Sequence, residues 1–564
     1  MKNKKLDIEV FAYDHIFRLI LDIFRFNEKQ YGDYVKDTIK ILLEFEKNGE
    51  TVIEVDKDLI FFDLLKDGWP NEHLKVLDYL GLLNCFNSPF VFTDGKLSLA
   101  KWSAKIDRVI GALVKKIDTK IPINSKSDNK LEQIKNIFET SNLVLLQGGP
   151  GTGKTTLIIN FILHFLRDDN FLNIGISAPT GKATARLKES LNDQKDIYLS
   201  KVLDQIECQT LHRWIFNSHN NSIKLRYKLK ELDVFIIDEM SMVNIDMIES
   251  FLSLLAKDCK IILVGDRNQL PPVNNCSIWN YLFEYSDNNL IKSCVVNLNK
   301  TFRNSGDIES LSSLIFNNKE SLFDQKIKEI EQDNKSREVT ILKSNNNNIP
   351  KKLLNLIKNH LNKLKHSTSN LSKKKYIFDN GIEDLMQHEK KLVNQILLDL
   401  QSNLILCEKN TGIWGVEYVN EIVLGQKKPY DLEALDEGVP IMCTKNNNEY
   451  GISNGDIGVL IGTNSKRKYL FRKFNENNEQ IVELIEPSYL ENVVPAIAIT
   501  IHKSQGSESE KISILWTQKP KLDKYKKNVY EEIEKVSFRD NYEKRLLYTA
   551  ITRAKKLLDI YYLN

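Results

Sequence analysis

Residues 148–155 form a glycine-rich run that ends in a lysine and a threonine: Gly148, Gly149, Pro150, Gly151, Thr152, Gly153, Lys154 and Thr155. Glycines let backbone N–H groups turn inward around a phosphate without Cβ clashes. The apolar run 143–146 precedes the loop and a helix is expected to begin near Thr156, which is the strand–loop–helix context of a P-loop. We predict an ATP site that includes Thr156 and the positive helix end, with Lys154 on the β- and γ-phosphates and Thr155 ligating Mg²⁺.

Two acidic residues follow a second apolar run. Residues 234–237 read Val-Phe-Ile-Ile, and Asp238 and Glu239 come directly after them. We expect Asp238 to hold Mg²⁺ through water and Glu239 to polarise the attacking water as general base. Since a base for water is provided, the pair indicates hydrolysis rather than phosphate transfer to a small acceptor.

Seven short motifs follow one another in a fixed order. They are APTGKA at 178–183, TLHR at 210–213, DEMSM at 238–242, GDRNQLPP at 265–272, KTFR at 300–303, TIHKSQGSE at 500–508 and YTAITRA at 548–554. Together with the P-loop, this series resembles that of superfamily 1 helicases, and its wording is nearest to the RecD group. The resemblance covers most of residues 131–564.

The resemblance implies roles around the nucleotide. Gln269 would sense the γ-phosphate, and Arg303 and Arg553 would be two arginine fingers that place planar cations on it in the transition state. Glu508 resembles the family acid that bonds the ribose, and Gln133 stands where the family reads adenine. Because Arg553 lies far downstream of the P-loop, ATP would bind between two domains and draw them together, as in a motor.

The resemblance also implies a groove for single-stranded DNA and 5′ to 3′ movement. Hydroxyls and cations suit phosphate contacts, and histidine can stack on a base. Ordinary structural loop residues stay an alternative for any single position. The matching positions are Thr180, Lys182, His212, Arg213, Thr500, His502 and Lys503.

Two sets of continuous apolar runs must position these residues. Unbroken runs suit parallel strands that are buried on both faces, and helical stretches separate them. We predict an α/β fold with two tandem RecA-like P-loop domains, at 131–345 and 401–564. The predicted strands are 143–146, 174–178, 234–237 and 261–264, then 404–407, 496–501, 512–516 and 557–562.

Three further segments complete the predicted organisation. Residues 1–120 carry helix-period apolar positions and no catalytic constellation, which indicates a mainly helical accessory domain. Residues 346–400 are a helical or flexible connector. Residues 435–490 contain short β-like runs separated by turn residues, so we expect a small β-barrel, which the resemblance identifies as SH3-like. Its runs are 439–443, 457–461, 469–471 and 481–484.

Composition narrows the class of protein. The net charge is only +3, from 79 basic and 76 acidic residues, so a nucleic-acid surface must be a local patch. None of the seven cysteines has metal-site spacing. The basic opening is soon broken by acids, which makes a poor secretory signal, and no apolar run could span a bilayer. We expect a cytoplasmic protein without a membrane partner.

The resemblance further implies partners. RecD proteins work in a heterotrimer with RecB and RecC at DNA ends, both double- and single-stranded, during recombinational repair. Their N-terminal region docks on a partner, and the nuclease site lies in RecB. Three alternatives stay open: the helicase half of a conjugative relaxase, an RNA helicase, and a nonmotor ATP-binding scaffold. The lone His15 and His73 count against the relaxase, and an intact catalytic set counts against the scaffold.

Overall fold

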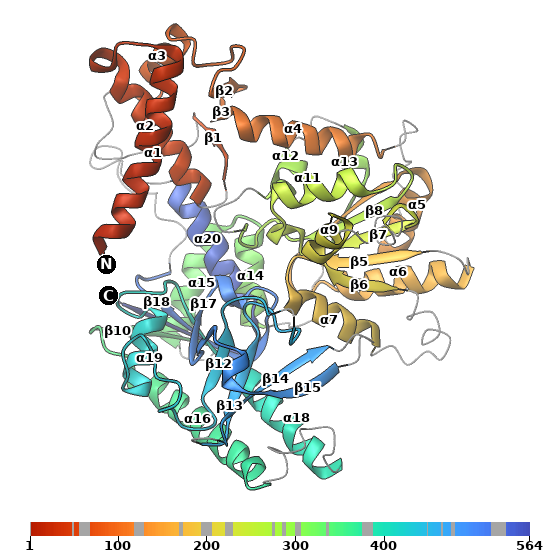
Figure 1. Ribbon diagram of the computed structural model, residues 1–564, viewed down its shortest axis with the longest axis vertical. Coiled ribbons are helices and arrows are strands. Elements are labelled where there is room, and N and C mark those ends of the chain that lie inside the picture. Colours follow the sequence, from red (N-terminus) through yellow and green to blue (C-terminus); the bar gives the residue numbers. More distant parts are fainter. Residues whose placement is uncertain are drawn as a thin grey trace.

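The protein contains two parallel sheets, an antiparallel insertion and an N-terminal region of helices with a small sheet (Figure 1). None of the helices described is long and apolar enough to cross a membrane. The computed structural model describes residues 2–47, 50–55, 68–117, 129–168, 173–192, 206–219, 229–272, 277–284, 289–298, 306–333, 338–374, 387–447, 449–463, 466–474, 480–520 and 537–563.

The first sheet has six strands in the order β6-β5-β7-β8-β4-β9, all paired in parallel. Four of them confirm the predicted strands and are buried along almost their whole length, which explains their unbroken apolar runs. The two strands at the sheet edges were missed, because both mix polar with apolar residues. The strands are β4 (Leu143–Gly148), β5 (Ile174–Ala178), β6 (Glu207–Thr210), β7 (Val234–Ile237), β8 (Lys260–Gly265) and β9 (Val295–Leu298).

Helices surround the first sheet in two groups. One group consists of α5, α6 and α7, which contact one another in sequence, and the other includes α9 and α11. The helices are α5 (Lys130–Thr140), α6 (Lys154–Asp168), α7 (Gly181–Asn192), α9 (Leu211–His219), α11 (Ile245–Leu254), α12 (Ile278–Glu284) and α13 (Asn289–Ser293). Since α6 and α7 begin where β4 and β5 end, their N-termini share one edge of the sheet.

The second sheet is also parallel, in the order β10-β19-β18-β11-β17. The four strands predicted here are confirmed, as β11 (Asn403–Cys407), β17 (Ala498–Thr500), β18 (Ser509–Trp516) and β19 (Ala554–Leu563). The fifth, β10 (Val339–Ser344), was not expected. The helices around this sheet include α14 (Asp307–Phe316), α15 (Glu320–Asp333), α19 (Val416–Leu424) and α20 (Ser537–Ile551).

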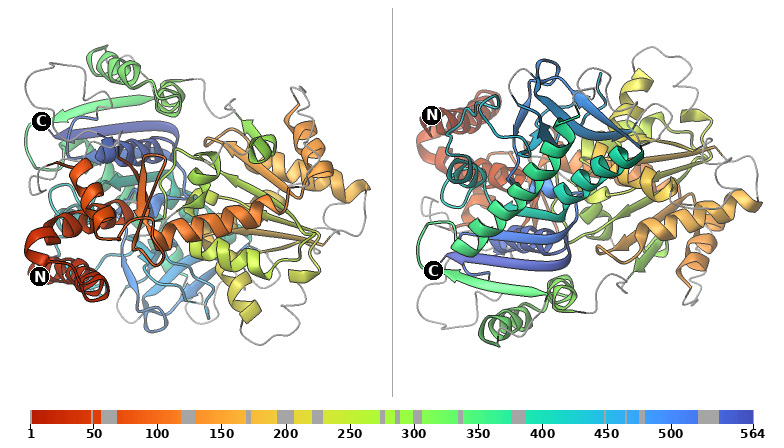
Figure 2. Two further views of the ribbon diagram at one scale, coloured as in Figure 1. Left: turned by 90° about the horizontal axis from the view of Figure 1, so that it is seen from above. Right: turned by 90° about the horizontal axis from the view of Figure 1, so that it is seen from below.

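The position of β10 corrects a predicted boundary. The first domain was expected to run to residue 345, yet β10 pairs with β19 over six residues, beginning at Val339 and Leu558 (Figure 2). Ile308 and Phe323, from the two helices before β10, are buried in the same core as Ile560. Residues from α14 onward therefore pack with the second sheet, and the chain crosses over about 40 residues earlier than predicted.

The insertion is a five-stranded antiparallel sheet in the order β15-β14-β13-β12-β16. Its strands are β12 (Pro440–Cys443), β13 (Ile457–Ile461), β14 (Lys468–Phe474), β15 (Gln480–Ile485) and β16 (Val493–Pro495), so it extends beyond the predicted end at 490. The described part of the connector is helical, as α16 (Lys351–Ser372) and α18 (Gln387–Ser402). Leu364 of α16 and Leu397 of α18 share a core with Leu470, so these helices support the insertion.

The N-terminal region holds more than helices. Its elements are α1 (Lys2–Phe24), α2 (Glu28–Lys47), β1 (Val52–Glu54), α3 (Asn71–Tyr79), β2 (Phe90–Thr93), β3 (Lys96–Leu99) and α4 (Ala100–Val114). The strands form a small antiparallel sheet in the order β1-β3-β2.

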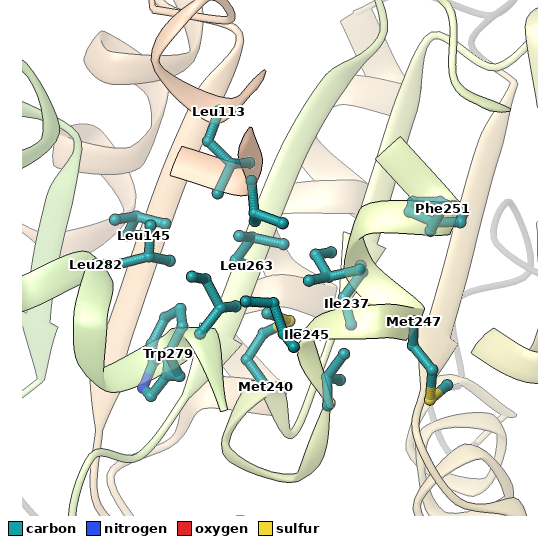
Figure 3. Packing of buried hydrophobic residues seen from close by; sticks show 14 of the residues in the cluster. Leu113, Leu145, Ile237, Met240, Ile245, Met247, Phe251, Leu263, Trp279 and Leu282 are labelled. Carbon is teal, nitrogen blue, oxygen red and sulfur yellow. The ribbon is translucent and has the colours of Figure 1, made fainter. Parts of the chain in front are cut away.

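The N-terminal region and the first sheet share one hydrophobic core. Leu113 of α4 packs with Leu263 of β8 and Leu282 of α12 in a continuous buried cluster (Figure 3). The Lys116 ammonium donates to the carbonyls of Ala256 (2.8 Å) and Cys259 (2.9 Å) beyond α11. The region is therefore fixed on the first sheet.

Candidate active site

The glycine-rich loop connects β4 to α6 as predicted. Gly151 and Gly153 have φ of +75° and +81°, a backbone region that favours glycine. The Thr152 hydroxyl donates to the Gly149 carbonyl at 2.8 Å. Lys154 Nζ donates to the carbonyls of Gly148 (2.7 Å) and Gly149 (2.9 Å), so its charge is held at the mouth of the loop.

The two acids lie beside the loop, at the end of β7. Asp238 is buried, and burial raises its pKa to about 6; Glu239 also raises this pKa, whereas Lys154 opposes the shift. The Glu239 amide donates to Asp238 Oδ1 at 2.8 Å. Electrostatic contact with Lys154 thus links the predicted metal ligand to the predicted phosphate ligand.

Glu239 has an unusual backbone and an unsatisfied side chain. Its φ of 54° is left-handed, which is uncommon outside glycine and is often found at functional sites. Its Oε2 is buried without a hydrogen-bond partner among the described residues. A buried acceptor of this kind suits a base that waits for a donor such as water.

The donor set at this edge fits a magnesium ion. The Asp238 carboxylate and the Thr155 hydroxyl are hard oxygen donors that follow β7 and the glycine-rich loop. No cluster of three or more His, Cys, Asp or Glu side chains suited to a metal occurs in the described part of the chain. Proteins usually hold Mg²⁺ by one or two carboxylates together with water and substrate phosphates, and this donor set is of that kind.

The turn after β8 carries Gln269 and an acid that sequence reasoning missed. Asp266 is fully buried, and burial raises its pKa, whereas nearby Lys154 opposes that shift. Asp266 Oδ1 accepts from the Asn268 amide at 3.0 Å, and its Oδ2 lies 3.5 Å from Gln269 Nε2. Gln269 Oε1 is buried and has no partner among the described residues. The GDRNQLPP motif was the available signal for Asp266.

Two side chains of α20 reach this turn from the second sheet. The Tyr548 hydroxyl donates to Asp266 Oδ2 at 2.9 Å, and the Leu270 amide donates to the Thr549 hydroxyl at 3.2 Å. A Cβ on Gly149 would lie 2.8 Å from the Tyr548 hydroxyl oxygen, so only glycine leaves room for it. Tyr548 was also missed, although it begins the YTAITRA motif.

Arg553 lies in the turn between α20 and β19. It is 2% exposed, and it donates from Nε to the Thr549 carbonyl (3.1 Å) and from Nη1 to the Ser507 carbonyl (3.3 Å). Burial and Asp266 raise the pKa of Tyr548 well above its ordinary value, and the charge of Arg553 opposes this. Both hydrogen-bond acceptors of Arg553 belong to the half of the molecule that holds the second sheet. Arg303, the other predicted arginine finger, lies outside the described residues.

Glu508 and Gln133 line different cavities. The Glu508 carboxylate accepts from Arg186 of α7 at 2.7 Å, an ion pair between the two sheets. Gln133 lines a cavity of about 510 Å³ with Arg267 and Asn297. Those last two residues also border a cavity of about 350 Å³, which is lined by both sheets and is of ligand size.

The predicted DNA residues fall into two groups. Lys182 and Arg213 line one cavity of about 300 Å³ that α7, the insertion and the second sheet enclose. Burial lowers the pKa of Lys182, and Asp456 of the insertion opposes this shift. Thr180 precedes α7, and His212 is exposed on α9.

The second group lies at the end of β17. The Thr500 hydroxyl accepts from the Lys503 amide at 3.4 Å. His502 Nε2 lies 3.0 Å from the Tyr542 hydroxyl, and the two rings are stacked. Burial lowers the pKa values of His502 and Lys503. This group is thus a separate part of the predicted DNA surface from Lys182 and Arg213.

Known proteins resemble this chain along most of its length. A family model described as an AAA domain matches residues 132–275. The protein named RecBCD enzyme subunit RecD from Buchnera aphidicola subsp. Schizaphis graminum is 29% identical, over 93% of this chain and 92% of its own length. Its namesake from Haemophilus influenzae is 27% identical over 74% of this chain and 66% of that protein.

These comparisons support the resemblance to the RecD group of superfamily 1 that the motif series indicates. An ATP-dependent DNA helicase is the enzyme class that these relatives support for this chain. The RecD match extends to both sheets, whereas the AAA domain model ends within the first. A solved structure of Bacteroides Pif1 bound to ssDNA is 17% identical and aligns with a TM-score of 0.39 over 78% of this chain and 92% of that chain.

Proposed function

We propose that this chain is the RecD-type motor subunit of a RecBCD helicase and nuclease, and that it moves 5′ to 3′ on single-stranded DNA while hydrolysing ATP. The observation that carries the proposal is the contact between the sheets at the glycine-rich loop. Lys154 and the acids come from the first sheet, Tyr548 reaches Asp266 from the second, and Arg553 lies in the turn after the helix that carries Tyr548. The RecD-named relatives support the cellular role at double-strand breaks.

The residues divide the hydrolysis step between them. Lys154 binds the β- and γ-phosphates, and Thr155 and Asp238 are placed to hold Mg²⁺, which neutralises phosphate charge when bound. Glu239 accepts a proton from the water that attacks the γ-phosphorus, and the bond to the bridging oxygen of ADP breaks. Arg553 stabilises the charge that spreads over the transferred group.

Hydrolysis couples to movement because residues of both sheets border the proposed nucleotide site. Bound ATP interacts with both sheets and favours their closed arrangement. After hydrolysis the γ-phosphate is no longer covalently attached to ADP, so the nucleotide no longer connects the two sheets. The remaining predicted site residues belong to this proposal: Gln133 for adenine, Glu508 for ribose, Gln269 and Arg303 for the γ-phosphate. Glu508 would have to release Arg186 first, since their ion pair spans 2.7 Å.

A DNA track is supported by the charge of the cavity beside α7. Lys182, Arg213 and Arg472 line it from the first sheet and the insertion. Cations from two units suit a phosphate backbone that must be gripped and released in turn. A 2′-hydroxyl distinguishes RNA from DNA, and no residue is predicted to contact one or to exclude one. An RNA helicase therefore stays the second outcome to test.

The proposed partners are RecB and RecC, with the nuclease activity assigned to RecB. The proposed organisation is an N-terminal docking region over 1–120, a first motor domain from 131, a second that includes residues 306–345, and an SH3-like insertion. Within the cell we place the complex in the cytoplasm. Exposed apolar side chains of the N-terminal region, Ile23, Tyr79 and Phe86, support docking of a partner.

A strand-separation assay tests the proposal. The chain is tested on duplexes with a 5′ tail and with a 3′ tail, alone and with co-purified RecB and RecC. We expect ATP-dependent unwinding of the 5′-tailed duplex, and ATP hydrolysis stimulated by single-stranded DNA more than by RNA. Lys154→Ala is expected to abolish both activities. Normal activity of Lys154→Ala would show that the nucleotide site is misplaced, a wild-type chain that neither unwinds the duplexes nor hydrolyses ATP would show a nonmotor role, and stronger stimulation by RNA would reassign the track.

A further inference from the structure

Among the hydrogen bonds that join the second sheet to the nucleotide turn, one comes from Tyr548, a residue without an assigned role. The Tyr548 side chain comes from α20 and is buried against the first sheet, with its hydroxyl 2.9 Å from Asp266 Oδ2. The absence of a side chain on Gly149 makes room for this hydroxyl. Tyr548 therefore occupies a place between the sheets that it can hold only when they are together.

Asp266 connects Tyr548 to Gln269. Its carboxylate accepts from the Tyr548 hydroxyl and from the Asn268 amide, and its Oδ2 lies 3.5 Å from Gln269 Nε2. The carboxylate is fully buried, so each donor has a large effect on its orientation. The long contact to Gln269 is the one that a rotation of the carboxylate would change first.

Gln269 Oε1 is suited to orienting the water that attacks the γ-phosphorus. Both Gln269 Oε1 and Glu239 Oε2 are buried acceptors without a partner among the described residues, and Glu239 and Lys154 both act electrostatically on Asp266. A water molecule carries two protons and is oriented best by two acceptors. Because Gln269 contacts Asp266 and Glu239 acts electrostatically on it, the two acceptors are expected to face one attacking water.

We propose that Tyr548 is a positioning residue, which orients Gln269 through Asp266 and so permits hydrolysis only when the two sheets are closed. This inference rests on the proposed function and deepens it by naming the link between closure and the chemical step. When the sheets part, Asp266 loses the hydroxyl, its carboxylate turns, and the Gln269 amide loses its orientation. ATP can then remain bound without being hydrolysed.

Steady-state kinetics of the Tyr548→Phe protein test the proposal. This variant keeps the ring and removes only the hydroxyl. We expect kcat for DNA-stimulated ATP hydrolysis to fall about tenfold, the value of one hydrogen bond to a charged group, while KM for ATP stays within about threefold. An unchanged KM separates positioning from a loss of nucleotide binding, and an unchanged Tm separates it from a loss of folding.

Epistasis with Gln269 provides the decisive measurement. In a Gln269→Ala background, adding Tyr548→Phe is expected to change kcat less than about twofold, because the orientation of a missing amide is irrelevant. Asp266→Asn is a second route to the same loss. A tenfold fall that persists in the Gln269→Ala background, or a Tyr548→Phe protein with wild-type kcat, overturns the proposal.

Two further variants serve as controls. Tyr562→Phe removes a β19 hydroxyl that donates to Glu331 of α15, away from the site, so its kcat should stay at the wild-type value. Lys154→Ala tests the proposed function itself through binding of a fluorescent ATP analogue and through hydrolysis. If Lys154→Ala is inactive and Tyr548→Phe is normal, only the positioning role fails; if Lys154→Ala hydrolyses ATP normally, the nucleotide site itself is misplaced.

Discussion

The two parallel sheets have the same construction but contribute different residues where they meet. At the meeting edge, the first sheet presents a glycine-rich loop and the carboxylates of Asp238, Glu239 and Asp266. The second sheet has no such loop among its described residues, and α20 and the turn that follows it supply Tyr548, Thr549 and Arg553. One sheet is built to hold the substrate and the other to respond to it.

This difference explains why neither sheet suffices. A P-loop and two acids bind a nucleotide with its metal but leave the charge of the transition state open on one side. A buried arginine and tyrosine have nothing to stabilise without a phosphate. Under the proposed mechanism, catalysis depends on how often the two sheets are closed, and a ligand bound across both sheets should change the rate.

The largest expected effect comes from removing the cation of the second sheet. Arg553→Ala should lower kcat for ATP hydrolysis by roughly 10³–10⁵-fold, the range for arginine fingers, with ATP binding retained. Arg553→Lys should recover little, because an ammonium lacks the planar fork. Steady-state kinetics and nucleotide titration measure both. Lys556→Ala, which breaks an exposed pair with Glu510, is the matched control; a kcat of Arg553→Ala within tenfold of that control would remove the assigned role.

On the first sheet, Glu239→Gln should stall the reaction after binding. Loss of a general base costs about 10²–10⁴-fold in rate, and the amide keeps the shape of the carboxylate. The bound state should accumulate, so filter binding with radiolabelled ATP should show retention. Glu249→Gln, an acid on α11 paired with Arg108, serves as control. Strong DNA-stimulated hydrolysis by Glu239→Gln would mean that another group is the base.

The core of the first sheet and the core of the insertion should respond differently to a substitution that leaves a cavity. Phe251 is fully buried in the core that joins the N-terminal region to the first sheet, whereas Phe471 is fully buried within the insertion. Either change to alanine should cost about 3–5 kcal/mol of unfolding free energy. Hydrogen exchange should show faster opening from α4 through β8 for Phe251→Ala, and only in the insertion for Phe471→Ala. Identical exchange patterns would mean that the cores are not separate.

The smallest effect concerns pH and the connector helices. Burial lowers the pKa of His360 on α16 to about 4 from 6.5, against the opposing charge of Asp399. The folded state thus binds this proton less readily, so its contribution to stability is present above pH 6.5 and is lost as pH falls toward 4. We expect a loss of about 1–2 kcal/mol after allowance for partial exposure.

Chemical denaturation at pH 7 and pH 5 measures this loss. His360→Gln should reduce the difference between the two values, and His366→Gln, an exposed position on the same helix, should leave it as in the wild type. An unchanged difference in His360→Gln would assign the pH dependence to other groups.

The sequence predicts the inner strands and the loop chemistry well, because both leave local signals. Strands that are buried on both faces must be apolar throughout, so β4, β5, β7 and β8 are visible as runs. The loop requires glycine at positive φ and a lysine at a fixed spacing. These requirements do not depend on the rest of the chain.

Long-range pairing leaves no comparable signal. The strand β10 belongs to the second sheet through partners more than 200 residues away, and nothing in residues 339–344 names those partners. Tyr548 and Asp266 come into contact only in the folded chain, because 282 positions separate them in the sequence. Their motifs were recognised, yet neither side chain stood out because tyrosine and aspartate have no obligatory partner in sequence.

The early crossing of the chain has a consequence for dissecting this protein. A fragment cut after residue 345 would leave the second sheet without the strand that covers the edge of β19 and without the helices that contribute Ile308 and Phe323. An uncovered strand edge is a template for self-association. Pieces meant to fold independently should therefore be divided near residue 306, and those divided at 345 are expected to aggregate.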